Sequence, residues 1–132
     1  MIHEILIGGV LIKIKVKGKL ENISNFETID IETNGIKNKE SIIFKDNDIK
    51  YTIKFNNSSI ILKRETEEFI NNFVFTEGKK SNSEYYIKEY KTNIDIEIYT
   101  TKIIKTDEYI KIHYQTSENN NSFIFTLEMR EK

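Results

Sequence analysis

Apolar and polar residues alternate along most of this chain, whereas the three-to-four-residue spacing of a helix is hard to find. In residues 10–17, Ile12, Ile14 and Val16 alternate with three lysines. Because successive side chains of a strand point to opposite faces, this pattern predicts a strand with one buried and one solvent-facing side. The same pattern predicts further strands over residues 26–33, 40–45, 49–55, 58–64, 73–77, 85–91, 94–104, 109–116 and 123–130.

Short polar segments between these strands predict turns. Residues 46–48 (Asp-Asn-Asp) suit a tight turn, and residues 78–83 and 117–122 are also expected to be turns. The acidic stretch 65–72 is expected to be a loop. Thr100 and Thr101, followed by adjacent isoleucines, predict a β-bulge that changes the phase of the strand.

Pairing of the first two strands can be predicted from side-chain chemistry. If Ile12 faces Ile31, then Ile14 faces Ile29 and Lys13 faces Asp30 on the other side. Apolar and opposite-charge cross-strand pairs both support this register.

The number of strands predicts the fold class. Roughly eight to ten short antiparallel strands fit a sandwich or a barrel, and closure is favoured because a sandwich leaves edge strands to protect. The length of 132 residues suits one core. We therefore expect an all-β chain that forms a single small closed barrel over residues 1–132, with residues 1–9 peripheral.

Composition narrows the classes of partner and compartment. The 20 basic and 21 acidic residues nearly cancel, so no polyanion such as nucleic acid is expected as a partner. The chain has no cysteine, which predicts a reducing, cytoplasmic location. The apolar run 5–12 is interrupted by lysines far short of the ~20 residues of a membrane span, so neither an anchor nor a secretory signal is expected.

Candidate catalytic groups are few. The two histidines are His3 and His113, and His113 is out of phase with its apolar neighbours, which predicts a solvent-facing side chain. The acid pairs Asp30/Glu32 and Asp95/Glu97 also occupy the outward phase. Gly8-Gly9 lacks the rest of any nucleotide-binding motif. We therefore expect no catalytic residue, no metal site and no cofactor, and a protein that is not an enzyme.

Polar residues in the inward phase are of more interest. Arg64 and Glu77 continue the apolar phase of their strands, and simple hairpin pairing puts Arg64 near residue 71. An inward arginine at a barrel end either plugs it or holds a ligand's carboxylate. The hydroxyls of Tyr51 and Tyr114 predict a polar spot inside the barrel. The inward aromatic residues are Tyr51, Phe55, Phe73, Phe75, Tyr114, Phe123 and Phe125.

Several short motifs resemble a family of uncharacterised small bacterial proteins, the YwiB-like family. They are Lys17-Gly18, residues 29–35 (IDIETNG), Lys63-Arg64, residues 75–79 (FTEGK), Tyr85-Tyr86, residues 94–102 (IDIEIYTTK) and the closing hairpin. The chain departs from the family pattern after Arg64, at residues 88–91 and at residues 36–44. The resemblance implies a calycin-like, lipocalin-like barrel and carries no activity with it.

Two hypotheses on function remain. The leading one is a non-enzymatic barrel that binds a small, largely apolar ligand, either neutral or anionic. The residues predicted to bind it are Arg64, Tyr51, Tyr114, Phe75 and Phe125. The alternative is a structural or interaction module with a solidly packed barrel, for which a homodimer is one arrangement. An interior volume of several hundred Å³, open at one end, would favour the first hypothesis.

Overall fold

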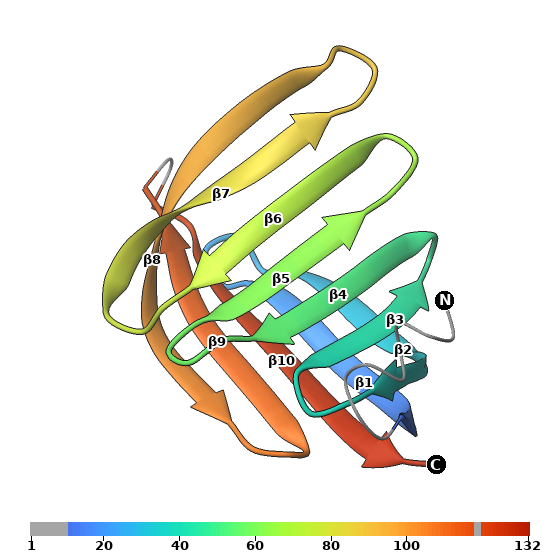
Figure 1. The fold of residues 1–132 in the computed structure, drawn as a ribbon. Coiled ribbons are helices and arrows are strands. Elements are labelled where there is room, and N and C mark those ends of the chain that lie inside the picture. Colours follow the sequence, from blue (N-terminus) through green and yellow to red (C-terminus); the bar gives the residue numbers. More distant parts are fainter. Residues whose placement is uncertain (1–10, 118–119) are drawn as a thin grey trace.

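A computed structural model describes residues 11–117 and 120–132, which form ten strands and no helix (Figure 1). No segment of this part of the chain is a helix able to cross a membrane. His3, Gly8-Gly9 and the start of the apolar run 5–12 lie outside the described residues. The strands are β1 Ile12–Asn22, β2 Glu27–Lys37, β3 Ser41–Asp46, β4 Ile49–Phe55, β5 Ile60–Glu65, β6 Phe69–Phe75, β7 Lys79–Ile87, β8 Thr92–Lys105, β9 Tyr109–Thr116 and β10 Ser122–Glu131.

Each strand pairs antiparallel with the next one in the chain, and β1 also pairs with β10 to close the barrel. The closed antiparallel barrel predicted from the alternation is therefore confirmed, with ten strands. The inward side chains form one core, whose most deeply buried large members are Phe75, Ile14, Ile31, Ile42, Ile53, Ile98, Ile110, Ile112 and Leu127.

The predicted register of the first hairpin was wrong. Ile12 pairs with Lys37 and Ile14 with Gly35, because β1 runs on to Asn22, into residues 18–25 that separate the two predicted strands, and β2 runs on past residue 33 to Lys37. The actual turn is only residues 23–26, where Phe26 has a left-handed φ of 65°. The shift is an even number of residues, so every side chain keeps the face that the alternation predicted.

Two segments expected to be irregular are strands in part, since residues 66–68 and Gly78 do form turns. β6 begins at Phe69, inside the predicted loop 65–72, and β7 begins at Lys79, inside the predicted turn 78–83. Polar residues in the inward phase concealed both strands. Buried Asn71 donates from Nδ2 to Ser83 Oγ at 3.2 Å and to the Glu84 carbonyl at 3.0 Å, so these polar side chains satisfy each other inside the wall.

The bulge in β8 is confirmed, since its pairing with β9 shifts between Thr100 and Lys102. Glu77, expected to point inward, is exposed beyond the end of β6. Its Oε1 accepts a hydrogen bond of 2.7 Å from the Ile103 amide, next to the bulge. The prediction was wrong because β6 ends at Phe75, so the phase of the strand does not continue to Glu77.

The two ends of the barrel differ in what they expose. We call the end where β1 begins and β10 finishes the terminal mouth, and the end with the β1–β2, β5–β6 and β7–β8 turns the opposite mouth (Figure 1). Arg64 lies near the opposite mouth, at the end of β5. Each mouth contains a candidate site.

Candidate functional site

The structure brings the predicted interior residues together near the opposite mouth. Arg64, Tyr51, Tyr114 and Phe125 line one cavity with Leu20, Ile31, Leu62 and Phe73. Phe75 lies behind Tyr114, with 5.0 Å between ring centroids. The cavity has a volume of ≈ 10 Å³, which is room for about one water molecule. The interior here is therefore nearly filled by side chains.

Arg64 occupies this cavity and forms no ion pair with a carboxylate of residues 11–117 and 120–132. Its strand pairs as predicted, with Arg64 opposite Asn71 on β6. The guanidinium carbon lies 5.6 Å from the centroid of the Tyr51 ring, a cation–π arrangement. The Nε atom is buried and has no hydrogen-bond partner among the described residues. One water in the cavity would satisfy it.

Tyr114 contributes a neutral hydroxyl rather than a base. Burial raises the pKa of the Tyr114 phenol well above its usual value, and the nearby charge of Arg64 offsets only part of that rise. The ring stacks on Phe123 with 5.0 Å between centroids. This cavity therefore presents one cation and aromatic rings, and no proton acceptor suited to catalysis at neutral pH.

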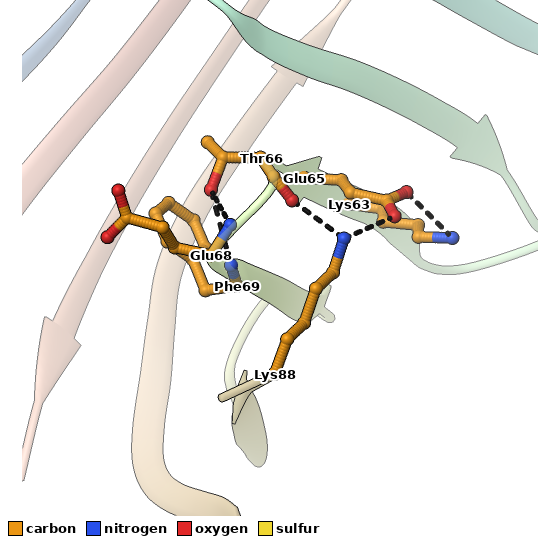
Figure 2. Close-up of polar contacts among 6 residues, drawn as sticks. All are labelled: Lys63, Glu65, Thr66, Glu68, Phe69 and Lys88. Atoms are coloured by element: carbon orange, nitrogen blue, oxygen red, sulfur yellow. Dashed lines mark hydrogen bonds and ion pairs between the residues drawn. The ribbon is translucent and has the colours of Figure 1, made fainter. Parts of the chain in front are cut away.

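Next to Arg64, on the outer side of the wall, Glu65 forms a polar cluster with Lys63, Lys88 and Thr66 that we call the clasp. Glu65, the next residue, points away from the interior, and Figure 2 shows its carboxylate between two lysines. Lys88 Nζ lies 3.2 Å from Glu65 Oε2 and donates to the Thr66 carbonyl at 2.7 Å, and Lys63 lies 3.7 Å from Oε1. The Lys88 hydrogen bond is the main reason that the pKa of Glu65 is lowered.

The clasp predicts a specific pH dependence of stability. Because the folded-state pKa of Glu65 is below its unfolded value of 4.5, its contribution is present above that pH and is lost as the carboxylate becomes protonated below it. In Glu65→Gln, melting temperature should therefore fall less steeply than in the wild type between neutral and strongly acidic pH. Thermal melts at several pH values test this.

Glu67→Gln is the matched control, since Glu67 lies two residues further on in the β5–β6 turn, is exposed and makes no ion pair within the described residues. It should preserve the wild-type acid dependence. A Glu65→Gln protein with the same pH profile as Glu67→Gln would contradict the role of the clasp.

A larger depression of ≈ 710 Å³ lies at the terminal mouth. Its apolar floor consists of Ile12, Ile42, Phe55 and Met129, of which Ile42 and Met129 are buried in the core. The turn between β8 and β9 forms one side. A volume of this size falls in the usual range for pockets that hold small molecules.

Two lysines in the inward phase stand over this floor. Lys37, at the end of β2, donates from Nζ to the Asp107 carbonyl at 2.6 Å. Lys105 Nζ, at the end of β8, lies 4.4 Å from the centroid of the Phe55 ring. Neither forms an ion pair with an acid in the described part of the chain. The rim carries both signs of charge, with Lys39 and Arg130 beside Asp107, Glu108 and Glu131.

Sequence reasoning did not select these lysines, although a signal for each was present. Lys37 continues the inward phase of Ile29, Ile31 and Thr33 once β2 is extended past Gly35. Lys105 is placed inward by the bulge, which moves the inward phase from Thr100 to Ile103. Phe55 was included in the inward aromatic set but not in the predicted site.

His113 belongs to neither candidate site. His113 lies on the outer face, half-buried, and burial together with Lys111 and Lys102 lowers its pKa. No cluster of metal-ligating side chains occurs in residues 11–117 and 120–132. A second depression of ≈ 710 Å³ lies over β1, β2, β10 and the β8–β9 turn, and charged residues of both signs make up half of its lining, among them Lys15, Lys17, Glu32 and Glu128.

Comparisons with known proteins bear on the fold alone. No protein-family model matches the chain, and no curated protein matches it. Among solved structures, the ywiB protein from Bacillus subtilis superposes with a TM-score of 0.67 over 92% of each chain, at 17% sequence identity. The resemblance seen in short motifs is thus confirmed at the level of architecture: this chain shares the barrel fold of the YwiB protein.

Proposed function

We propose that this barrel binds, without catalysing a reaction, a small amphipathic anion at its terminal mouth. The observation that carries the proposal is the ≈ 710 Å³ depression in which two lysines without acid partners, Lys37 and Lys105, stand over an apolar floor. Such a site suits one acidic group joined to an apolar body. A ligand of this kind agrees with the small, largely apolar and optionally anionic molecule expected from the sequence.

The geometry favours the terminal mouth over the Arg64 cavity. With ≈ 10 Å³ of free volume, the Arg64 cavity cannot hold a molecule larger than water unless side chains move. Arg64 therefore suits the structural interpretation, as a plug that stacks on Tyr51 and closes the interior. In the depression, by contrast, Lys37 and Lys105 can reach a carboxylate while the half-buried Phe55 and Ile12 contact the apolar body.

We further assign the chain to the calycin-like binding barrels and to the cytoplasm. The first assignment rests on the closed antiparallel barrel with a pocket at one mouth, and the second on the absence of cysteine.

Titration with sodium decanoate, monitored by calorimetry, tests the proposed site. The double variant Lys37→Gln/Lys105→Gln should bind decanoate at least about tenfold more weakly, since charge-assisted hydrogen bonds to the carboxylate are lost. Binding of the uncharged analogue decan-1-ol should be unchanged, because the apolar floor is intact.

Arg64→Ala is the matched control, and its affinity for decanoate should stay at the wild-type level. Loss of binding in Arg64→Ala together with full binding in the lysine double variant would move the site to the opposite mouth. No binding of decanoate by the wild type would refute the proposed ligand class.

The nearly filled interior supports a second candidate, an interaction module without a small ligand. Such a protein would bind no decanoate and would depend on its outer surface. Sedimentation velocity of the wild type separates a self-associating module from a monomer that needs a different partner.

A further inference from the structure

β2 is longer than the ladder that joins it to β3. It pairs with β1 along its whole length, from Glu27 to Lys37. Its pairing with β3 covers only Gly35 to Lys37, with one further contact from Thr33 Oγ1 to the Lys45 carbonyl. Residues 27–32 therefore have no neighbouring strand on the β3 side among the described residues.

The backbone groups that face this open side can be identified. The Asn38 amide donates a hydrogen bond to the Ser41 carbonyl across the β2–β3 turn, so the backbone amide of Asn38 points to the β3 side of β2. Since successive residues of a strand point their amide and carbonyl groups to alternate sides, Thr28, Asp30 and Glu32 present theirs to the open edge. The side chains of all three are exposed. Unpaired edges of this kind are templates for an additional strand.

The side chains beside the edge specify the chemistry of a partner strand. Asp30 and Glu32 lie on the outer face, and Ile29, in the inward phase, is 43% exposed. An added strand would place residues of its own beside these, so basic residues would complement the acids and apolar residues would cover Ile29. β1 already shows this pattern on the other side of β2, with Lys17 opposite Glu32 and Lys19 opposite Asp30.

A second copy of this chain is a poor partner for the edge. Antiparallel pairing of two copies centred on Asp30 would place one Asp30 beside the other. Like charges directly opposite each other destabilise a strand pair. The observations therefore favour a different chain.

We propose that the open edge of β2, residues 28–32, binds an extended segment of another protein in which basic and apolar residues alternate, by addition of a strand to the barrel wall. This interaction surface is separate from the terminal mouth, because it lies at the other end of β2 from Lys37.

β8 provides an internal comparison. The tetrapeptide Ile-Asp-Ile-Glu of residues 29–32 recurs at residues 94–97, where β8 extends past β9. This edge is shorter, since the Ser117 amide donates to the Glu97 carbonyl at 3.0 Å. By the same alternation, Asn93 and Asp95 face its open side. Asp95 lies opposite an acid, Glu84 on β7, whereas Asp30 lies opposite Lys19 on β1.

Hydrogen exchange and amide chemical shifts of the full chain, followed by NMR, test the proposal. The probe is a short capped peptide in which lysine alternates with valine. It should slow exchange at the amides of Thr28, Asp30 and Glu32 more than at those of Asn93 and Asp95. Asp30→Lys/Glu32→Lys should weaken binding at least about tenfold, and should favour a peptide in which glutamate replaces lysine. Asp95→Lys is the matched control and should bind the lysine peptide as the wild type does.

Three outcomes would overturn the proposal. One is equal binding of the same peptide with N-methylated backbone amides, which would show charge attraction without strand addition. Another is unchanged exchange at Thr28, Asp30 and Glu32 at saturating peptide. The third is a wild-type dimer in which these amides are already protected, which would assign the edge to a second copy.

Discussion

Phe75→Ala is expected to lower the free energy of unfolding by about 3–5 kcal/mol, the usual range for removing a large buried aromatic side chain. Phe75 is 0% exposed and is the largest of the most deeply buried side chains. It stacks on Phe73 with 5.3 Å between ring centroids and also contacts Tyr114. Its removal would leave a cavity that the surrounding strands can fill only in part. Chemical denaturation of the wild type and the variant measures the difference.

Tyr90→Ala is the control for the same measurement. Tyr90 is an aromatic residue in the β7–β8 turn and is 70% exposed. Its truncation should change stability by no more than about 0.5 kcal/mol. Equal stability of Phe75→Ala and Tyr90→Ala would contradict a tightly packed barrel interior.

Gly35→Ala is expected to destabilise the protein by about 1–3 kcal/mol, because a side chain would be forced into space that is already filled. A Cβ at residue 35 would lie 2.7 Å from the Ile43 carbonyl oxygen and 2.9 Å from the Phe44 Cβ. Both atoms belong to the paired strand β3. The first is a backbone atom and the second is bonded directly to the backbone, so neither can move freely. Thermal and chemical unfolding of the variant test this.

The neighbouring position supplies the control. Asn34 is exposed and lies on the other face of β2, so Asn34→Ala should unfold close to the wild type. If Gly35→Ala were as stable as Asn34→Ala, the close approach of β2 and β3 at Gly35 would be refuted.

Alternation predicted the faces of the strands better than their ends. The inward phase predicted for residues 12–17 of β1 and for β4 and β9 was correct, because apolar side chains mark it at nearly every second position. β6 and β7 were partly missed, since Asn71 and Ser83 occupy inward positions where they satisfy each other by a hydrogen bond. No single segment of sequence reveals such a partner, because the two residues come from different strands.

The register of the first hairpin failed for a different reason. Alternate pairings shifted by an even number of residues keep every side chain on its face, so periodicity alone cannot choose between them. In the structure the pairing is the longer one, in which Gly18 lies opposite Ile31 on β2 and opposite Leu127 on β10. At Gly18 a Cβ would come within 2.7 Å of the Thr126 carbonyl oxygen, so the close packing of three strands depends on this glycine.

The residues that line the Arg64 cavity were predicted from the sequence, but the size of this cavity and the depression at the terminal mouth were not. Arg64, Tyr51, Tyr114 and Phe125 do share one cavity, as their common inward phase suggested. The size of that cavity depends on how side chains from seven different strands fill it, which alternation does not report. The depression at the terminal mouth also depends on tertiary structure, since it joins the ends of β1, β2, β3, β4, β8 and β10.

Whether a small acidic ligand occupies the terminal mouth can be measured by native mass spectrometry of the protein from the cells that naturally produce it, before and after denaturation. The wild-type protein should carry the mass of one small acidic molecule and lose it on denaturation. Lys37→Gln/Lys105→Gln should be bare, and Arg64→Ala should still carry the ligand. A wild-type protein without added mass, or a ligand retained by the lysine variant and lost by Arg64→Ala, would contradict a ligand site at the terminal mouth.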